Sequence, residues 1–172
     1  MPDQAIAVPV GLTTEGLLAK RYMARLMDGM LLSILAFIAS MGGSRLLPDS
    51  IAGVAGTLAL LVLIALFWIG YGAVLESSPM QATIGKRVMG LKVYNADGGR
   101  LALSQAAFRN LVKDGPFLLF GLLPGVQLLS VVWLAAHLVV LHRSPVSQAI
   151  HDRAARTWVA APEHTVQLRL SN

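Results

Sequence analysis

The segment IAGVAGTLALLVLIALFWIGYGAVL, residues 51–75, runs for 25 residues without a charged side chain. A helix needs about 20 mostly apolar residues to cross the roughly 30 Å hydrocarbon core of a bilayer. The segment therefore predicts a membrane-spanning helix. Trp68 and Tyr71 near its end are typical of the aromatic belt at a membrane interface, and Glu76 follows as the first charge.

The composition of the 172-residue chain also indicates a membrane environment. Hydrophobic residues make up 55% of it and charged residues only 13%, against roughly 25% charged residues in typical soluble domains. The net charge of +5 comes from cations that cluster between apolar segments. We therefore expect membrane lipids as partners, with anionic headgroups at the cytoplasmic face, and no nucleic acid. The absence of cysteine excludes disulfides and thiolate chemistry.

A second apolar stretch, AKRYMARLMDGMLLSILAFIAS (residues 19–40), carries charges at its beginning. On a helix, Arg21, Arg25 and Asp28 fall on one stripe. An ionised aspartate inside a bilayer costs about 2.5–3.5 kcal/mol even on insertion scales. Two interpretations remain open: an ion pair within the helix that offsets this cost, or an acid with a function.

The middle of the chain, KRVMGLKVYNADGGRLAL (residues 86–103), places turn residues at 95–99 between two apolar runs. This pattern predicts a β-hairpin. RTWVAA (residues 156–161) predicts a further strand. Because an isolated hairpin is marginally stable in water, we expect this third strand to join it, which requires both regions to share a compartment.

The last apolar region, residues 117–141, is divided by Pro124-Gly125. One kinked helix would give three membrane crossings, whereas a hairpin of two helices would give four. Basic residues flank the first span, fill the middle segment and follow the last apolar block. The positive-inside rule places all three in the cytoplasm, which requires an even number of crossings. We predict an all-α multi-pass protein with four membrane helices, the third and fourth forming a hairpin at Pro124-Gly125, and a small cytoplasmic β-hairpin.

The expected organisation is one membrane domain over residues 17–161. Residues 1–16 form an N-terminal tail in which Thr13 or Thr14 caps the first helix, and residues 162–172 form a C-terminal tail.

Three motifs in order resemble the RDD family of small bacterial membrane proteins. They are the spacing Arg21-x-x-Ala24-x-x-x-Asp28, the segment TIGKRVMGLKVYNADGGRLALSQAAFRNLVK (residues 83–113), and AIHDRAARTWVA (residues 149–160). The resemblance covers nearly the whole chain and implies a multi-pass protein of the bacterial inner membrane. It also implies transport, with cation/proton exchange proposed for the family.

By this resemblance, Arg21 is the family arginine, Asp28 the first aspartate and Asp152 the second. Arg25 is a rival for the arginine role. The sequence departs from the family at Gln81, where a glycine is usual. The supporting residues of the expected site are Arg25, Glu76, Thr83, Gly85, Lys86, Arg109 and His151.

Two functions follow for a charge cluster in which Arg21 lies between Asp28 and Asp152. Two carboxylates sharing a partly dry site have shifted, coupled pKa values, as in a proton-coupled transporter of a small cation. Alternatively, the arginine clamps helices together through charge-assisted bonds, in a non-catalytic module that binds or assembles partner proteins. A homo-oligomer or a partner membrane protein fits either function. No nucleophile–base pair or metal-ligand spacing is present, so we expect no enzyme, no cofactor and no metal.

Overall fold

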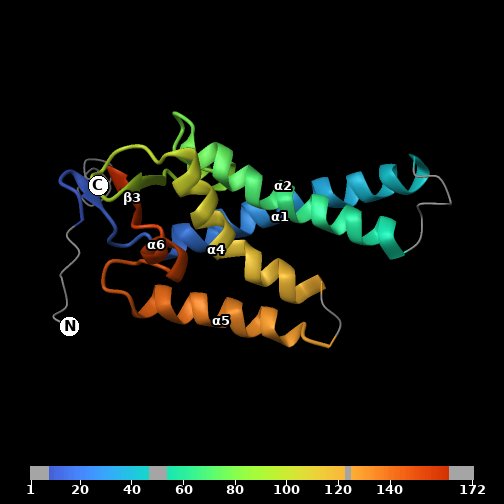
Figure 1. The fold of residues 1–172 in the computed structure, drawn as a ribbon. Coiled ribbons are helices and arrows are strands. Elements are labelled where there is room, and N and C mark those ends of the chain that lie inside the picture. Colours follow the sequence, from blue (N-terminus) through green and yellow to red (C-terminus); the bar gives the residue numbers. More distant parts are fainter. Residues whose placement is uncertain (1–7, 47–53, 123–124, 163–172) are drawn as a thin grey trace.

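The computed structural model describes residues 8–46, 54–122 and 125–162. Within these ranges the chain forms mainly helices, with three short strands. The strands gather at one end of the molecule, and the long helices extend from them toward the opposite end (Figure 1).

Two long apolar helices, α1 (Leu18–Leu46) and α2 (Val54–Ser77), form where the sequence predicts the first two spans, and both are long enough to cross a membrane. Their membrane-length portions are Leu18–Gly42 and Leu58–Ser77, with mean hydropathies of 1.6 and 2.5. Only 11% and 12% of these portions are buried inside the protein. The apolar core helices of a soluble protein are mostly buried, whereas these two apolar helices are mostly exposed. Such helices are typical of a protein surrounded by lipid.

The last apolar region forms two helices rather than one kinked helix. The helices α4 (Leu103–Leu122) and α5 (Leu128–Arg143) lie side by side (Figure 1). Their connection includes Gly125, whose φ of +84° glycine adopts without strain. The other residue of the predicted turn, Pro124, lies outside the described residues. Helix α4 continues through Pro116, and α5 is the shorter apolar helix, about 24 Å long at 1.5 Å per residue.

The three strands form one antiparallel sheet in the order β1-β3-β2. The central strand β3 (Thr157–Pro162) is the one predicted from RTWVAA. It pairs with β2 (Lys92–Asn95) on one side and with β1 (Leu12–Thr13) on the other. The sheet therefore joins segments that precede α1, follow α2 and follow α5, so all three lie at the same end of the molecule.

The predicted β-hairpin over residues 86–103 is wrong. Only β2 forms, and the edge of β2 away from β3 is occupied by Gln81, whose carbonyl accepts from the Val93 N–H at 2.7 Å. The turn does close, since the Asn95 N–H donates to the Gly99 carbonyl at 3.0 Å. The chain then buries Leu101 in the core and enters α4 instead of a second strand.

The expected cap at Thr13 or Thr14 is also wrong. Thr13 lies in β1, opposite Ala161, and α1 begins only at Leu18. The Thr13 hydroxyl instead accepts from the Glu15 N–H at 3.2 Å. Part of the expected N-terminal tail is thus an edge strand of the sheet.

A small hydrophobic core holds the sheet against the beginnings of the helices. Leu17, Leu91, Val93, Leu101 and Val159 pack together and are almost completely buried. Full burial of one such side chain contributes roughly 1.5–3 kcal/mol. This core fixes the position of the sheet relative to α1 and α4.

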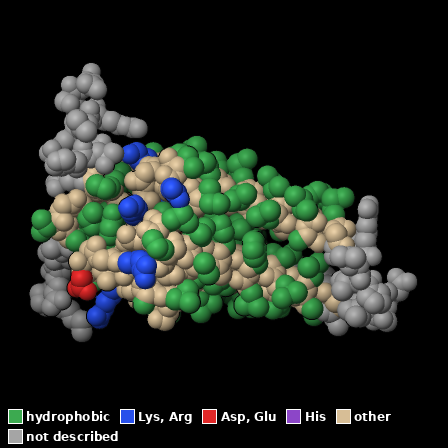
Figure 2. All heavy atoms as spheres, turned by 90° about the horizontal axis from the view of Figure 1, so that it is seen from above, with side chains coloured by type: hydrophobic (Ala, Val, Ile, Leu, Met, Phe, Trp, Pro, Cys, Tyr) green, Lys and Arg blue, Asp and Glu red, His purple; other side chains and the backbone are tan. Residues whose placement is uncertain are grey.

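The character of the surface changes along the long axis of the molecule, from hydrophobic over the helices to basic near the sheet. Figure 2 shows hydrophobic side chains over the helices, whereas Lys and Arg side chains gather toward the end that carries the sheet. This division is typical of a protein whose helices enter a membrane while its polar end stays at the headgroups.

Candidate functional site

A buried carboxylate, Asp152 in the short helix α6 (Ile150–Ala154), joins two long helices. Arg21 of α1 binds one of its oxygens, Oδ2, and Arg109 of α4 donates to the other, Oδ1, at 2.6 Å. The Ala149 N–H donates to Oδ2 at 3.0 Å, which holds the start of α6. The Arg21 guanidinium also donates to the Ser147 carbonyl. The family arginine and the second aspartate are therefore direct partners.

The same arginine of α4 continues the network to α2. Arg109 donates to Oε2 of Glu76 at 2.6 Å, and Lys86 of α3 (Ile84–Val88) binds Oε1. The Asn110 amide donates to Oε2 at 2.9 Å. Glu76 and Arg109 are completely buried. Buried charges are costly unless paired, and here each carboxylate has a cation on both oxygens.

These contacts make a chain of alternating charges, which we call the clamp network: Arg21, Asp152, Arg109, Glu76 and Lys86. It runs through α1, α6, α4, α2 and α3. The hydroxyl of Thr157 in β3 accepts from Nε of Arg109 at 3.1 Å and ties the sheet to the network. One connected set of bonds thus fixes five helices and the sheet at one end of the molecule.

The electrostatics of the network follow from burial and pairing. Burial alone would raise the pKa of Asp152, but the guanidinium groups of Arg21 and Arg109 hold that pKa well below its ordinary value. Burial lowers the pKa of the Lys86 ammonium to about 8, although Glu76 opposes this change. Burial likewise holds the pKa of His151 well below its ordinary value, against the pull of Asp152. Asp152 is therefore ionised and His151 neutral at neutral pH.

The first aspartate of the family pattern has different partners. Oδ1 of Asp28 accepts from the Tyr71 hydroxyl and from the Gly85 N–H, both at 2.8 Å, and Oδ2 accepts from the Thr83 hydroxyl at 2.6 Å. These neutral donors come from α2 and from the start of α3. A β-carbon at Gly85 would collide with the Ala24 carbonyl oxygen, so α3 approaches α1 this closely only with glycine there.

The structure therefore brings Arg21 and Asp152 together but keeps Asp28 apart from both. The expected ion pair of Asp28 with the arginines of its own helix is not formed among the described residues. Arg25 instead donates to Asp114 of α4 at 2.6 Å. The reason is α3, which inserts its first turn against α1 and supplies the donors for Asp28.

A second group of charges was missed by the sequence analysis. Asp114 accepts from Arg25 and lies 3.2 Å from Lys113. Lys113 also donates to Oδ1 of Asn110 at 2.6 Å, which connects this group to Glu76. The sequence did contain a signal. Lys113 and Asp114 directly precede the apolar half of α4, and Arg25 lies in the apolar stretch that forms α1. Charges at membrane depth are costly, so they indicate pairing inside the protein.

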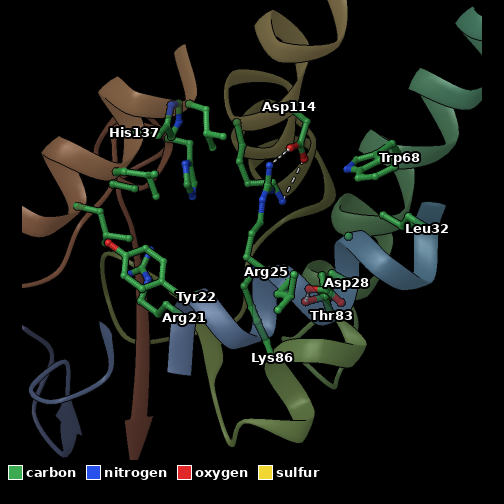
Figure 3. Close-up of a pocket in the computed structure, with 18 of the residues that line it drawn as sticks. Arg21, Tyr22, Arg25, Asp28, Leu32, Trp68, Thr83, Lys86, Asp114 and His137 are labelled. Atoms are coloured by element: carbon green, nitrogen blue, oxygen red, sulfur yellow. Dashed lines mark hydrogen bonds and ion pairs between the residues drawn. The ribbon is translucent and has the colours of Figure 1, made fainter. Parts of the chain in front are cut away.

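A cavity of about 650 Å³ lies beside these charges, walled by α1, α4 and α5 with contributions from α2, α3 and α6. In Figure 3 the Arg25 side chain extends from α1 toward Asp114, while Asp28 and Thr83 lie together on another side. His137 and His151 also line the cavity, with their rings stacked at 5.1 Å. Within the described ranges, no three His, Asp or Glu side chains come together that could hold a metal ion.

These observations define a mainly helical protein with two apolar helices of membrane length, in which buried ion pairs join the helices to a small sheet. The RDD family matches residues 16–156, from just before α1 to just before β3, and the chain belongs to this family. The matched region contains Arg21, Asp28, Asp152 and all other charges of the network. No curated protein and no solved structure matches the chain.

Proposed function

We propose that this chain is a non-catalytic membrane module whose Arg/Asp cluster is a structural clamp. The observation that carries the proposal is the saturation of Asp152 and Glu76: each carboxylate oxygen already binds a cationic side chain of the protein. A carboxylate in this state has no oxygen left to receive a transported cation. The low pKa of Asp152 also opposes its use as a proton carrier.

The clamp gives the module a fixed end for holding partner proteins. We place the sheet and both termini on the cytoplasmic side, because the Lys and Arg side chains gather there. Helices α1 and α2 each cross the membrane. The hairpin of α4 and α5 enters the membrane from the cytoplasmic side and returns to that side. The number of crossings is then even. A second copy of the chain or another membrane protein would bind the exposed helices within the bilayer.

A double-mutant cycle with Arg21→Gln and Asp152→Asn tests the clamp. Residues in one ion-pair network show coupling energies of about 0.5–3 kcal/mol. We expect coupling in this range, measured by equilibrium unfolding in detergent. Additive effects of the two substitutions would contradict the clamp.

A second function, transport of a small cation coupled to protons, rests on Asp28. It is the acid of the site that lines the cavity and receives its hydrogen bonds from neutral groups. Its charge is therefore not neutralised by a directly bound cation among the described residues. Tyr71, Thr83 and Asp28 oxygens are hard ligands of the kind that small cations prefer.

Flux through liposomes separates the two functions. The purified protein is reconstituted with an internal pH dye, and sodium, potassium and lithium gradients are imposed in turn. Cation-dependent proton movement that disappears in Asp28→Asn, but remains in the exposed control Asp97→Asn, would establish transport. Well-folded protein without movement supports the clamp module.

A further inference from the structure

The cavity opens between α1 and α5, where residues of both helices line it as a groove. Its outer walls are apolar: Leu26 and Met30 come from α1, and Leu134 and Leu138 come from α5. A second hollow of about 290 Å³ lies between the same two helices and shares Leu138. These wall residues are 41–58% exposed, so a hydrocarbon chain beside the protein can reach them directly.

The inner end of the groove is positively charged. Arg25 and Lys113 both bind the single carboxylate of Asp114, which leaves one positive charge uncompensated within this group. The Arg25 side chain is 45% exposed despite this bond. The wider site repeats the imbalance, since it holds five cations and four carboxylates: Arg21, Arg25, Lys86, Arg109 and Lys113 against Asp28, Glu76, Asp114 and Asp152.

Two buried nitrogen atoms at the cavity have no hydrogen-bond partner among the described residues. They are Nε2 of His137 and Nδ1 of His151, and each histidine is only 8% exposed. Buried polar atoms in native proteins are nearly always paired. Nδ1 of His137 donates to the Trp133 carbonyl and Nε2 of His151 faces Asp152, so the two unpartnered nitrogens are acceptors. Both rings line the cavity, and a ligand in it that carries hydroxyl groups would supply the missing donors.

A ligand that satisfies all of these surfaces is both anionic and apolar. A phosphate group is the anion that guanidinium and ammonium groups bind through charge-assisted hydrogen bonds. A free phosphate would leave the apolar walls uncovered, and an uncharged lipid would leave the positive charge uncompensated. The apolar groove and the positive charge at its inner end therefore fit an anionic amphiphile, and the surrounding bilayer already contains such molecules.

We propose that the groove between α1 and α5 is a binding site for one anionic membrane phospholipid. The phosphate lies at Arg25 and Lys113, a hydroxyl group of the lipid headgroup donates to Nε2 of His137, and one acyl chain lies along Leu26, Met30 and Leu138. The lipid enters sideways from the membrane. The site goes beyond the proposed function, because it holds whether the module binds partners or moves a cation.

The test measures lipid binding to the purified full-length protein in detergent, by native mass spectrometry. Three probes are compared: phosphatidylglycerol, phosphatidylcholine with the same acyl chains, and glycerol phosphate as the headgroup alone. We expect phosphatidylglycerol to bind at least about tenfold more tightly than either of the others. Equal affinity for glycerol phosphate would identify a site for a soluble anion and overturn the lipid assignment.

Arg25→Gln tests the charged end of the groove. We expect it to weaken phosphatidylglycerol binding about tenfold and to leave phosphatidylcholine binding unchanged. The matched control is Arg100→Gln, which removes the same charge at an exposed position outside the groove. If the control weakens binding equally, the attraction is a general effect of net charge and the proposal fails.

Leu138→Trp tests the apolar end without touching the charges. Leu138 is 41% exposed and lines the groove, so the substitution fills the groove while the fold is retained. We expect loss of phosphatidylglycerol binding, whereas Leu119→Trp, an exposed position of α4 outside the groove, preserves it. Unchanged binding in Leu138→Trp would overturn the proposal even if Arg25→Gln did not fold.

Discussion

The carboxylate of Asp152 is the point at which two guanidinium groups and the start of α6 meet. Asp152→Asn keeps the shape of the side chain but leaves Arg21 and Arg109 facing a neutral group. Removing one partner of a buried ion pair costs about 3–5 kcal/mol. We expect a loss of this size in the free energy of unfolding, measured in detergent. Asp97→Asn, at an exposed turn, is the control and should leave stability unchanged.

A second prediction concerns Gly85, where the backbone of α3 lies close to the backbone of α1. In Gly85→Ala, the added methyl group would meet the Ala24 carbonyl oxygen and press on the Asp28 carboxylate. Overpacking of this kind costs about 1–3 kcal/mol, and we expect that loss in thermal or chemical unfolding. At Gly29, the residue directly after Asp28, a β-carbon meets nothing within 4 Å. A Gly29→Ala variant as unstable as Gly85→Ala would contradict this explanation.

For single residues, the sequence identified the members of the candidate site better than it identified their partners. Arg21, Asp28, Asp152, Thr83 and Gly85 were all singled out, and all of them lie in the site. Their pairings were not predictable from helical spacing, because the partners of Asp28 come from α2 and from the start of α3. Only the three-dimensional path of the chain decides which of several nearby charges meet.

In the segment before β2, Gln81 affects stability in two opposite ways, through its backbone conformation and through a side-chain hydrogen bond. Gln81 has a φ of +53°, which is strained for a residue other than glycine. Its side-chain amide donates to the Val93 carbonyl at 3.2 Å and thereby closes the edge of β2. The family's usual glycine would remove the strain but also this bond.

Substitutions at Gln81 separate these two contributions. Gln81→Ala loses the hydrogen bond and keeps the strained backbone, whereas Gln81→Gly loses the bond but relieves the strain. The left-handed conformation costs a residue other than glycine about 1–2 kcal/mol. We therefore expect the glycine variant to be more stable than the alanine variant by this amount, as measured by the unfolding midpoint. The reverse order would show that the positive φ carries no cost here.

The elements differ in how well sequence alone predicts them. α2 follows from an uninterrupted apolar run and α1 from an apolar run with charges at its beginning, and the division between α4 and α5 follows from Pro124-Gly125. The partners of β2 do not follow, because its neighbour β3 lies more than 60 residues away. Turn residues at 95–99 correctly indicated a turn, yet the choice of partner strand depended on Gln81 and on the core around Leu101.

For the whole molecule, the low pKa values of His151 and Asp152 determine how stability depends on pH. His151 is neutral in the folded state and takes up a proton on unfolding once the pH falls below about 6.5. The unfolded state then binds more protons, so stability falls with falling pH, by at most about 1.4 kcal/mol per pH unit for this group. Asp152 adds a further loss below about pH 3.8.

Unfolding measured between pH 7 and pH 5 checks this expectation. The protein should lose stability across this range, and His151→Gln should lose less. His142→Gln, at an exposed position of α5, serves as the control and should follow the parent protein. An unchanged pH dependence in His151→Gln would assign the effect to other groups.

The place of β3 and Asp152 in the chain has a consequence for biogenesis. Both follow all the long helices, so they leave the ribosome after α1, α2, α4 and α5 have been made. Until then, Arg21 has no carboxylate partner from α6, and β1 and β2 have no strand between them. Insertion into the membrane and completion of the fold are therefore separate events in time. A chain that stalls after α5 would keep one incomplete end, with unpaired edges on β1 and β2 and an uncompensated arginine, by which a quality-control protease can distinguish it from the finished protein.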